Sequence, residues 1–254
     1  MKEVTAKIYF VGAGPGDPEL ITLKGRQLLD KADIVVYAGS LVNQELLRGI
    51  PAQCLDSASL NLDEIIAIME QGILANKMIV RLHTGDPSLY GAIKEQMVRL
   101  ESLGIPYEIV PGVSSASAVA AVLKEELTRP ELSQTVIITR HAGRTPVPER
   151  ENLRSLAAHR STMLIFLSVQ LIEEVVKELY HAYPETTPAA VVYKASWADQ
   201  LILRGSLKTI AQQVREAGIQ KTAIIVVGNI LDNELKAVSK LYNKEFTHEY
   251  RKNK

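Results

Sequence analysis

Short apolar runs alternate with amphipathic helical segments through residues 7–123, and each run ends in a loop rich in Gly, Pro or Ser. Such alternation with short connections indicates a mostly parallel β-sheet. Loops that follow parallel strands gather at one edge of the sheet, where open α/β sheets usually bind their ligands. The strand ends near Val11, Tyr37, Arg81 and Val110 could therefore share one cleft.

The loop Arg81–Gly91, Arg-Leu-His-Thr-Gly-Asp-Pro-Ser-Leu-Tyr-Gly, is the most informative of these. It follows the apolar run Met78-Ile79-Val80, which reads as the end of a buried parallel strand. Gly85 gives the backbone freedom, whereas Pro87 removes a donor and fixes φ. A lone Gly-Asp-Pro is equally typical of a plain strand-to-helix turn. Its partner loops are Gly12–Pro18 and Pro111–Ser115.

A second α/β unit is predicted to begin near Arg129, where Thr128-Arg129-Pro130-Glu131 breaks a helix. Residues 201–204 are expected to add an antiparallel strand, which makes its sheet mixed. We predict an N-terminal domain at 1–128, a C-terminal domain at 129–234 and a polar tail at 235–254. A ligand cleft is expected between the two domains. Further strands are predicted over 135–139, 162–167, 189–193 and 223–227.

The amino-acid composition argues against several classes of protein. The 29 basic and 29 acidic residues cancel, which argues against a broad nucleic-acid surface. The single cysteine, Cys54, excludes an intrachain disulfide and is predicted to be a small buried hydrophobe in a reducing compartment. No apolar run reaches membrane-spanning length and no signal-peptide pattern is present, so we expect a cytoplasmic protein without a membrane partner. The histidines lack metal-ligand spacing, and no resident metal is predicted.

The glycine turn after the first strand resembles half of a dinucleotide-binding fingerprint. Its third glycine should stand where Asp17 does, and a carboxylate there would oppose a pyrophosphate. This disfavours NAD binding. The chain also lacks a Gly-Lys-Ser/Thr phosphate loop and a Gly-x-Ser-x-Gly elbow, although a Ser-His-Asp arrangement stays open.

The loops together resemble the signatures of the tetrapyrrole methylases. Gly12–Pro18 with Leu20-Ile21-Thr22 is similar to the first signature, Gly85-Asp86-Pro87 with Tyr90-Gly91 to the second, and Pro111–Ser115 to the third. The similarity runs from residue 6 to about 232, in the family's order. Stretches that resemble the precorrin-4 C11-methyltransferase group are His83–Pro87, Thr139-Arg140, Gly143–Glu149 and Val192–Trp197.

This resemblance implies transfer of a methyl group from S-adenosylmethionine to a ring carbon of a cyclic tetrapyrrole, in corrin synthesis. It also implies the class III methyltransferase fold, with two α/β domains and a homodimer. A buried strand residue is the alternative reading of Leu167, which could otherwise cover the adenine. The cofactor contacts carried over from the family are Pro15, Thr84, Gly85, Asp86, Leu89, Ser114, Ser115, Leu167 and Ala195.

A tetrapyrrole with many carboxylates requires positive charge in its site. Arg129, Arg140, Arg144 and Lys194 are predicted to bind the substrate, with solvated surface charge as the alternative for each. Arg81 and His83 are predicted catalytic residues, and His83 or a water could accept the proton that leaves the ring.

The uroporphyrinogen methylases of this family carry an acid after the second strand and a lysine after the next segment. Tyr37–Ser40 and Leu55–Ala58 supply neither group, which favours a different substrate position. Other functions stay open. They are methylation of another tetrapyrrole, of a modified histidine on a protein or of an RNA ribose, and ligand carriage without turnover. Neutral net charge disfavours RNA.

Overall fold

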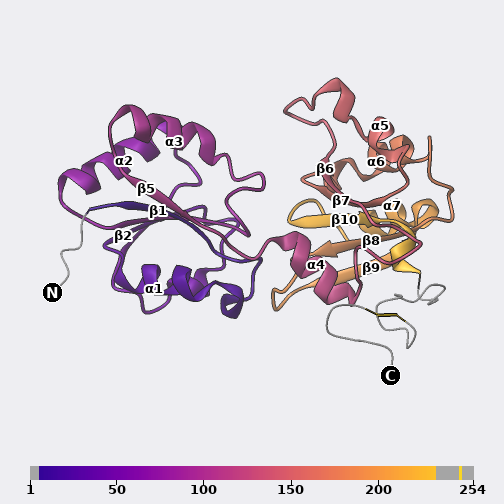
Figure 1. The fold of residues 1–254 in the computed structure, drawn as a ribbon, viewed down its shortest axis with the longest axis horizontal. Helices are drawn as coiled ribbons and strands as arrows, with labels where there is room; N and C mark the ends of the chain where they lie inside the picture. The colour runs from indigo at the N-terminus through magenta and orange to yellow at the C-terminus, as the bar shows by residue number, and fades with distance from the viewer. Residues whose placement is uncertain (1–5, 233–245, 248–254) are drawn as a thin grey trace. The chain divides into compact units, whose positions relative to one another are not determined.

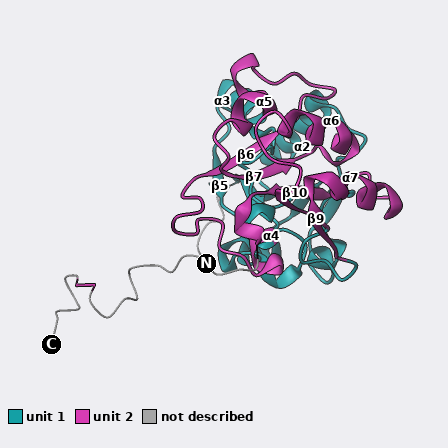
Figure 2. Cartoon of the chain, turned by 90° about the vertical axis from the view of Figure 1, so that its right-hand side faces the viewer, with its two compact units in different colours: residues 1–118, 194–199 teal, residues 119–193, 200–254 magenta. Residues whose placement is uncertain are grey.

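The computed structural model describes residues 6–232 and 246–247 (Figure 1). Contacts divide the chain into two compact units (Figure 2). Unit 1 contains residues 1–118 and 194–199, and unit 2 contains residues 119–193 and 200–254. The domain limits 1–128 and 129–234 stay a prediction. The predicted tail at 235–254 lies outside the described residues, except for Phe246 and Thr247.

Unit 1 is built on a five-stranded sheet in the order β3-β2-β4-β1-β5, and every neighbouring pair is parallel. This confirms the predicted N-terminal sheet. Its strands are β1 (Ile8–Gly12), β2 (Ile34–Tyr37), β3 (Gln53–Asp56), β4 (Ile79–His83) and β5 (Tyr107–Val110).

Helices cover both faces of this sheet, α1 (Leu23–Lys31) on one and α2 (Leu62–Leu74) with α3 (Ile93–Ser102) on the other (Figure 1). Alternate residues of β4 therefore enter different cores, Val80 on the α1 side and Ile79 on the α2–α3 side. Connections from the neighbouring strands β1 and β4 leave on opposite faces. The carboxyl ends of these two strands thus mark the topological switch point of the sheet.

Side-chain caps fix where the helices of unit 1 begin. Thr22 Oγ1 accepts from the Gly25 amide at 3.1 Å at the start of α1. Asn61 and Glu64 form a reciprocal capping box at the start of α2. The helix α4 (Ser115–Leu123) follows β5 and is divided between the two units.

Unit 2 has a mixed sheet in the order β6-β7-β10-β8-β9, as predicted. Only the β6–β7 pair is parallel, and β9 pairs with β8 in the expected antiparallel sense. The strands are β6 (Val136–Arg140), β7 (Thr162–Phe166), β8 (Pro188–Tyr193), β9 (Leu201–Ser206) and β10 (Ala223–Val227).

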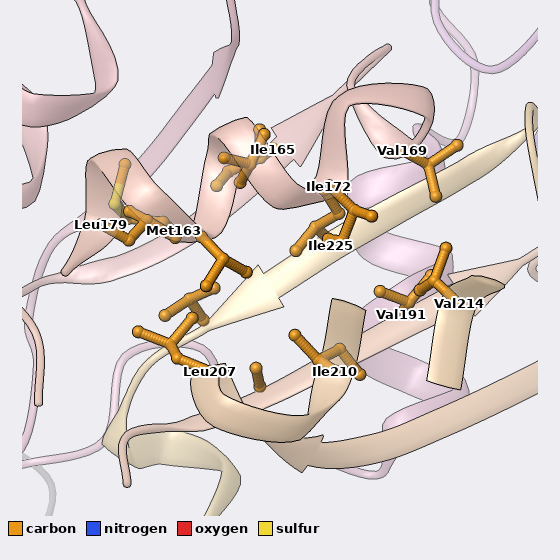
Figure 3. Packing of buried hydrophobic residues seen from close by; sticks show 14 of the residues in the cluster. Met163, Ile165, Val169, Ile172, Leu179, Val191, Leu207, Ile210, Val214 and Ile225 are labelled. Carbon is orange, nitrogen blue, oxygen red and sulfur yellow. The ribbon is translucent and has the colours of Figure 1, made fainter. Parts of the chain in front are cut away.

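The core of unit 2 lies between this sheet and its helices α5 (Leu153–Ala157), α6 (Ile172–Leu179) and α7 (Leu207–Glu216) (Figure 3). Apolar residues at helical spacing on α6 and α7 contact alternate residues of β7, β8 and β10. Leu179 is fully buried in this cluster. Short 3-10 helices cover Pro18–Leu20, Gln44–Leu47, Glu149–Glu151, Val169–Leu171 and Asn229–Leu231.

The prediction that Cys54 is buried is wrong, because the structure places this side chain in an exposed position. It lies on β3, which is at the edge of the unit 1 sheet and is mostly exposed along its length. An apolar residue on a short edge strand can face solvent, because only one side of the strand has a neighbour.

Candidate functional site

Three loops of unit 1 meet at the carboxyl edge of its sheet, because β4, β1 and β5 are neighbours. The Ala13 amide donates to the His83 carbonyl at 2.7 Å, and Gly14 and Gly85 exchange two backbone hydrogen bonds at 2.8 and 3.3 Å. A Cβ on Gly112 would lie 2.1 Å from the Gly85 carbonyl oxygen. A Cβ on Gly12 would lie 2.5 Å from the Gly112 Cα. A side chain is thus excluded sterically at Gly12 and Gly112, whereas Gly85 favours glycine through its φ of 61°.

The Asp86 side chain links the loop after β4 to the loop after β5. Its Oδ2 accepts from the Gly112 amide at 2.8 Å, and its Oδ1 accepts from the Ser88 amide at 2.8 Å and from the Ser88 hydroxyl. Burial raises the pKa of Asp86, but these hydrogen bonds together lower it, and the net direction is downward. The carboxylate therefore organises the loops. The pattern Asp-x-Ser, typical of an Asx turn, is the sequence signal for the part played by Ser88.

Asp17, at the position of the third fingerprint glycine, begins the 3-10 helix Pro18–Leu20. Its Oδ1 accepts from the Glu19 amide at 2.9 Å. The acid thus has a local capping role.

The remaining loop residues provide hydroxyl and apolar groups. Thr84 is exposed, Leu89 is 36% exposed and Pro15 is buried. Ser114 precedes α4, and its Oγ accepts from the Ala116 amide at 3.2 Å. Ser115 is half-buried in the first turn of that helix, where backbone amides favour a negative group.

Arg81 and His83 lie on β4 itself, which corrects the expectation that the loop begins at residue 81. The strand continues to His83 because β1 pairs with it up to the Gly12–His83 position. Arg81 is 6% exposed, and it donates to Gln96 Oε1 and to the Val36 carbonyl, each at 3.2 Å. Burial lowers its pKa to about 10.

His83 is 9% exposed and lies beside the Phe10 ring, with centroids 6.0 Å apart. Its Nε2 is buried without a hydrogen-bond partner among the described residues. Burial first, and the charge of Arg81 second, lower its pKa to about 3. At neutral pH the imidazole is uncharged and a weak base, which favours a packing or positioning role over proton transfer.

Leu167, in unit 2, is not a buried strand residue. It follows β7 with a φ of 55° and is 71% exposed. Ser168 stabilises the turn after β7. Its hydroxyl donates to the Phe166 carbonyl at 2.6 Å and accepts from the His141 amide at 2.8 Å. An apolar side chain held outward in this uncommon backbone conformation is typical of a functional position.

The predicted substrate-binding residues of unit 2 differ in their surroundings. Arg129 is buried, and its Nη1 donates to the carbonyls of Ile230 and Asp232 at 3.1 and 2.8 Å, which favours a structural role. Arg140 donates to the carbonyls of Thr145 and Pro146 at 3.1 and 2.6 Å and so holds the loop after β6.

Arg144 lies in that loop and is exposed. Two predicted residues belong to the 194–199 segment of unit 1. Lys194 pairs with Asp199 at 2.5 Å, and Ala195 is 7% exposed. The structure thus brings the predicted residues Pro15, Thr84–Asp86, Leu89 and Ser114–Ser115 together on the loops of unit 1, and it places Leu167, Arg129, Arg140 and Arg144 in unit 2.

No helix in the described part of the chain combines the length and apolarity needed to cross a membrane. Within residues 6–232 and 246–247, no three His, Cys, Asp or Glu side chains cluster in a way that could hold a metal ion.

Comparison with known proteins identifies the family. The family described as Tetrapyrrole (Corrin/Porphyrin) Methylases matches residues 7–211. A Methanocaldococcus jannaschii protein named cobalt-precorrin-4 C(11)-methyltransferase is 58% identical over 249 residues, which are 97% of this chain and 96% of that protein.

Solved structures agree with the sequence relatives. A cobalt precorrin-4 methyltransferase superposes with a TM-score of 0.87 and 50% identity, covering 89% of this chain and 96% of that one. A Thermus thermophilus uroporphyrin-III C-methyltransferase complexed with S-adenosyl homocysteine gives a TM-score of 0.75 and 28% identity, covering 89% and 99%. With its loop signatures, its fold and these relatives in agreement, the chain belongs to the tetrapyrrole (corrin/porphyrin) methylases.

Proposed function

We propose that this chain is an S-adenosylmethionine-dependent methyltransferase that methylates carbon 11 of cobalt-precorrin-4 or precorrin-4, in corrin ring synthesis. The observation that carries the proposal is the 58% identity, over nearly the whole of both chains, to a relative with that activity in its name. Any cobalt would arrive coordinated by the macrocycle, as part of the substrate.

The loops of unit 1 fit the cofactor. S-adenosylmethionine supplies, when bound, an electrophilic methyl group on a sulfonium. The glycine meeting point leaves no side chains between the backbones, and Thr84, Ser114 and Ser115 offer hydroxyls for the amino-acid and ribose ends. Leu89 is proposed to supply apolar surface for the adenine, and the exposed Leu167 of unit 2 is kept as a candidate contact on the family resemblance alone. Pro15, Gly85 and Ala195 contribute backbone, and Asp86 holds the loops in shape.

The substrate's carboxylates are proposed to bind cationic groups. Arg144 is exposed and Arg140 fixes the loop that carries it, so this loop is the strongest candidate in unit 2. Lys194 holds a carboxylate partner of its own, Asp199, which a substrate carboxylate would have to displace. Arg129 is proposed to act through the fold, because its Nη1 donates to two backbone carbonyls.

Catalysis is proposed to depend on alignment and exclusion of water. An electron-rich ring carbon can attack a sulfonium methyl group directly, and good positioning can supply about 7–11 kcal/mol of the barrier. Arg81 and His83, as the predicted catalytic pair, are proposed to support the loop from inside the sheet. A water then accepts the ring proton, since the low pKa of His83 makes it a weak base.

The protein is further proposed to be a homodimer, as the family resemblance implies, and to be cytoplasmic, as the sequence analysis predicts. Light scattering on the purified protein measures its mass in solution. A monomer at micromolar concentration would contradict the dimer.

The experiment that tests the function has two stages. Calorimetric titration with S-adenosylhomocysteine should show micromolar binding at one site per chain. Incubation with S-adenosylmethionine and cobalt-precorrin-4, or the cobalt-free compound, should then add one methyl group, located at carbon 11 by NMR. Binding without methyl transfer to either tetrapyrrole would indicate another substrate or a carrier, and absence of binding would remove the cofactor.

A further inference from the structure

The segment Lys194–Asp199 follows β8 in the chain, yet its contacts group it with unit 1. There it lies against the loop after β1. The Trp197 indole Nε1 donates to the Pro15 carbonyl at 2.9 Å, and the Asp17 amide donates to Ser196 Oγ at 3.0 Å. These contacts join residues 182 and 179 positions apart in sequence.

Several backbone polar groups of the Pro15–Asp17 turn are satisfied by side chains, whereas the Asp17 carbonyl accepts from the Leu20 amide at 3.0 Å. Besides the two side-chain contacts above, Asn43 Nδ2 donates to the Gly16 carbonyl at 2.9 Å. Three successive residues of the turn are thus each held by a distant side chain. Such a turn keeps its shape only while those partners are in place.

The indole also fills the space over Gly16. A Cβ at that position would lie 2.0 Å from Trp197 Cδ1 and 2.2 Å from its Nε1. The ring is itself positioned, because the Lys194 ammonium lies 5.2 Å from its centroid and is paired with Asp199. Close packing of glycine against an indole fixes the turn more tightly than the hydrogen bonds alone would.

The segment holds a conformation that its residues disfavour. Lys194 and Ser196 have φ values of 47° and 70°, in the left-handed region that non-glycine residues rarely occupy. Strain of this kind persists only where surrounding contacts maintain it, and it is concentrated at functional sites.

We propose that Trp197 and Ser196 are positioning residues, which hold the Pro15–Asp17 turn in the shape that binds the cofactor. This inference rests on the proposed function, because it assigns the turn to the S-adenosylmethionine site. Trp197 and Ser196 act through the backbone they hold. Their loss should therefore raise KM for S-adenosylmethionine and leave kcat nearly unchanged.

Trp197 is the only tryptophan of the chain, so its fluorescence reports on this one contact. Titration of the wild-type protein with S-adenosylhomocysteine should shift or quench its emission, with the same Kd that calorimetry gives. The variant Trp197→Phe keeps an aromatic ring but loses the donor to Pro15. Its Kd for S-adenosylhomocysteine should rise about fivefold, as expected for one lost hydrogen bond.

Tyr183→Phe is the matched control. It removes one donor to a backbone carbonyl, that of Ser161 at 2.6 Å, within unit 2. Its Kd should equal that of the wild type. If Trp197→Phe fails to fold, as judged by circular dichroism, Ser196→Ala supplies the test, because it removes the hydroxyl that accepts from the Asp17 amide.

The outcomes separate the two proposals. Failure of the wild-type protein to bind S-adenosylhomocysteine overturns the proposed function. Wild-type binding with an unchanged tryptophan emission, and with a wild-type Kd in Trp197→Phe or Ser196→Ala, overturns the positioning role alone.

Discussion

The parallel sheet of unit 1 and the mixed sheet of unit 2 each have five strands, but they differ in how their loops are supported. In unit 1, backbone contacts backbone where Gly12, Gly85 and Gly112 meet, and side chains such as Asp86 and Trp197 add to that support. In unit 2, single side chains hold the turns, the Arg140 guanidinium after β6 and the Ser168 hydroxyl after β7. Backbone contacts leave no room for a new atom, whereas a side-chain contact can be lost without steric conflict.

If the two units have separate cores, a destabilising substitution in one core should leave the shape of the other unit's loops unchanged. Leu179→Ala removes a fully buried side chain from the core of unit 2 and should lower the free energy of unfolding by about 2–5 kcal/mol. The Kd for S-adenosylhomocysteine at 20 °C, measured by calorimetry, should stay close to the wild-type value. The exposed Leu74, substituted by alanine, is the control, and a large loss of affinity in Leu179→Ala would contradict the comparison.

The glycine meeting point should be the least tolerant position of unit 1. A Cβ at Gly112 would overlap the Gly85 carbonyl, so Gly112→Ala should lower the free energy of unfolding by about 1–3 kcal/mol and abolish measurable S-adenosylhomocysteine binding. In unit 2, Gly143→Ala is the matched change, because its Cβ would meet Leu171 at an ordinary 3.5 Å. Denaturant titration and calorimetry check both variants. Tight binding by Gly112→Ala would refute the steric argument.

Acid should weaken unit 1 through His83. Its pKa is about 3 in the folded chain and 6.5 in the unfolded chain, so the unfolded chain takes up a proton that the folded chain refuses. Stability is present above pH 6.5 and is lost as the pH falls toward 3, by about 1.4 kcal/mol per pH unit, or about 2 kcal/mol by pH 5.

Replacing the buried imidazole should therefore flatten that pH dependence. The free energy of unfolding of His83→Gln should fall less between pH 7 and pH 5 than that of the wild type. His159→Gln, at an exposed site, should leave the wild-type slope. Equal slopes in all three proteins, measured by denaturant titration, would mean that His83 does not carry the acid sensitivity.

The smallest effects are expected in the side-chain-held loop of unit 2. Arg144→Ala removes an exposed cation and should weaken tetrapyrrole binding about fivefold, while S-adenosylhomocysteine binding persists. Arg140→Ala should have a similar or larger effect, because the loop also loses its hydrogen bonds to Arg140. Fluorescence titration with the tetrapyrrole checks both, and unchanged affinity in both variants would exclude this loop from the substrate site.

Local patterns predicted most of the fold. Alternation of strands and helices indicated the parallel and mixed sheets. Thr22 and Asn61 cap their helices through short-range hydrogen bonds, and interactions of that range are the ones that a local sequence pattern can reveal. The end of β4 was placed too early, because polar residues at 81 and 83 look like loop. Pairing with β1 overrides that local preference. The exposure of Cys54 likewise depends on the position of β3 at the sheet edge.

The site was predictable only in part. The loop signatures indicated Gly85, Asp86 and Ser114 as candidate cofactor contacts, because each of these residues stands in a short motif, and the structure brings the two motifs together through the Asp86–Gly112 hydrogen bond. No local pattern could reveal that Arg129 donates to carbonyls about a hundred residues away, or that Trp197 contacts Pro15. Such contacts join distant parts of the chain, and single-sequence reasoning has no signal for them.

The late position of the 194–199 segment also has a consequence for how the molecule is made. All strands of the unit 1 sheet precede residue 111, whereas two of the three side chains that hold the Pro15–Asp17 turn, Ser196 and Trp197, come after residue 193. A nascent chain emerging from the ribosome can thus form the sheet long before the turn has all of its partners. Pulsed hydrogen exchange during refolding should show the same order, with the amides of β1 and β4 protected before that of Asp17. Simultaneous protection would show that the turn and the sheet form in one step.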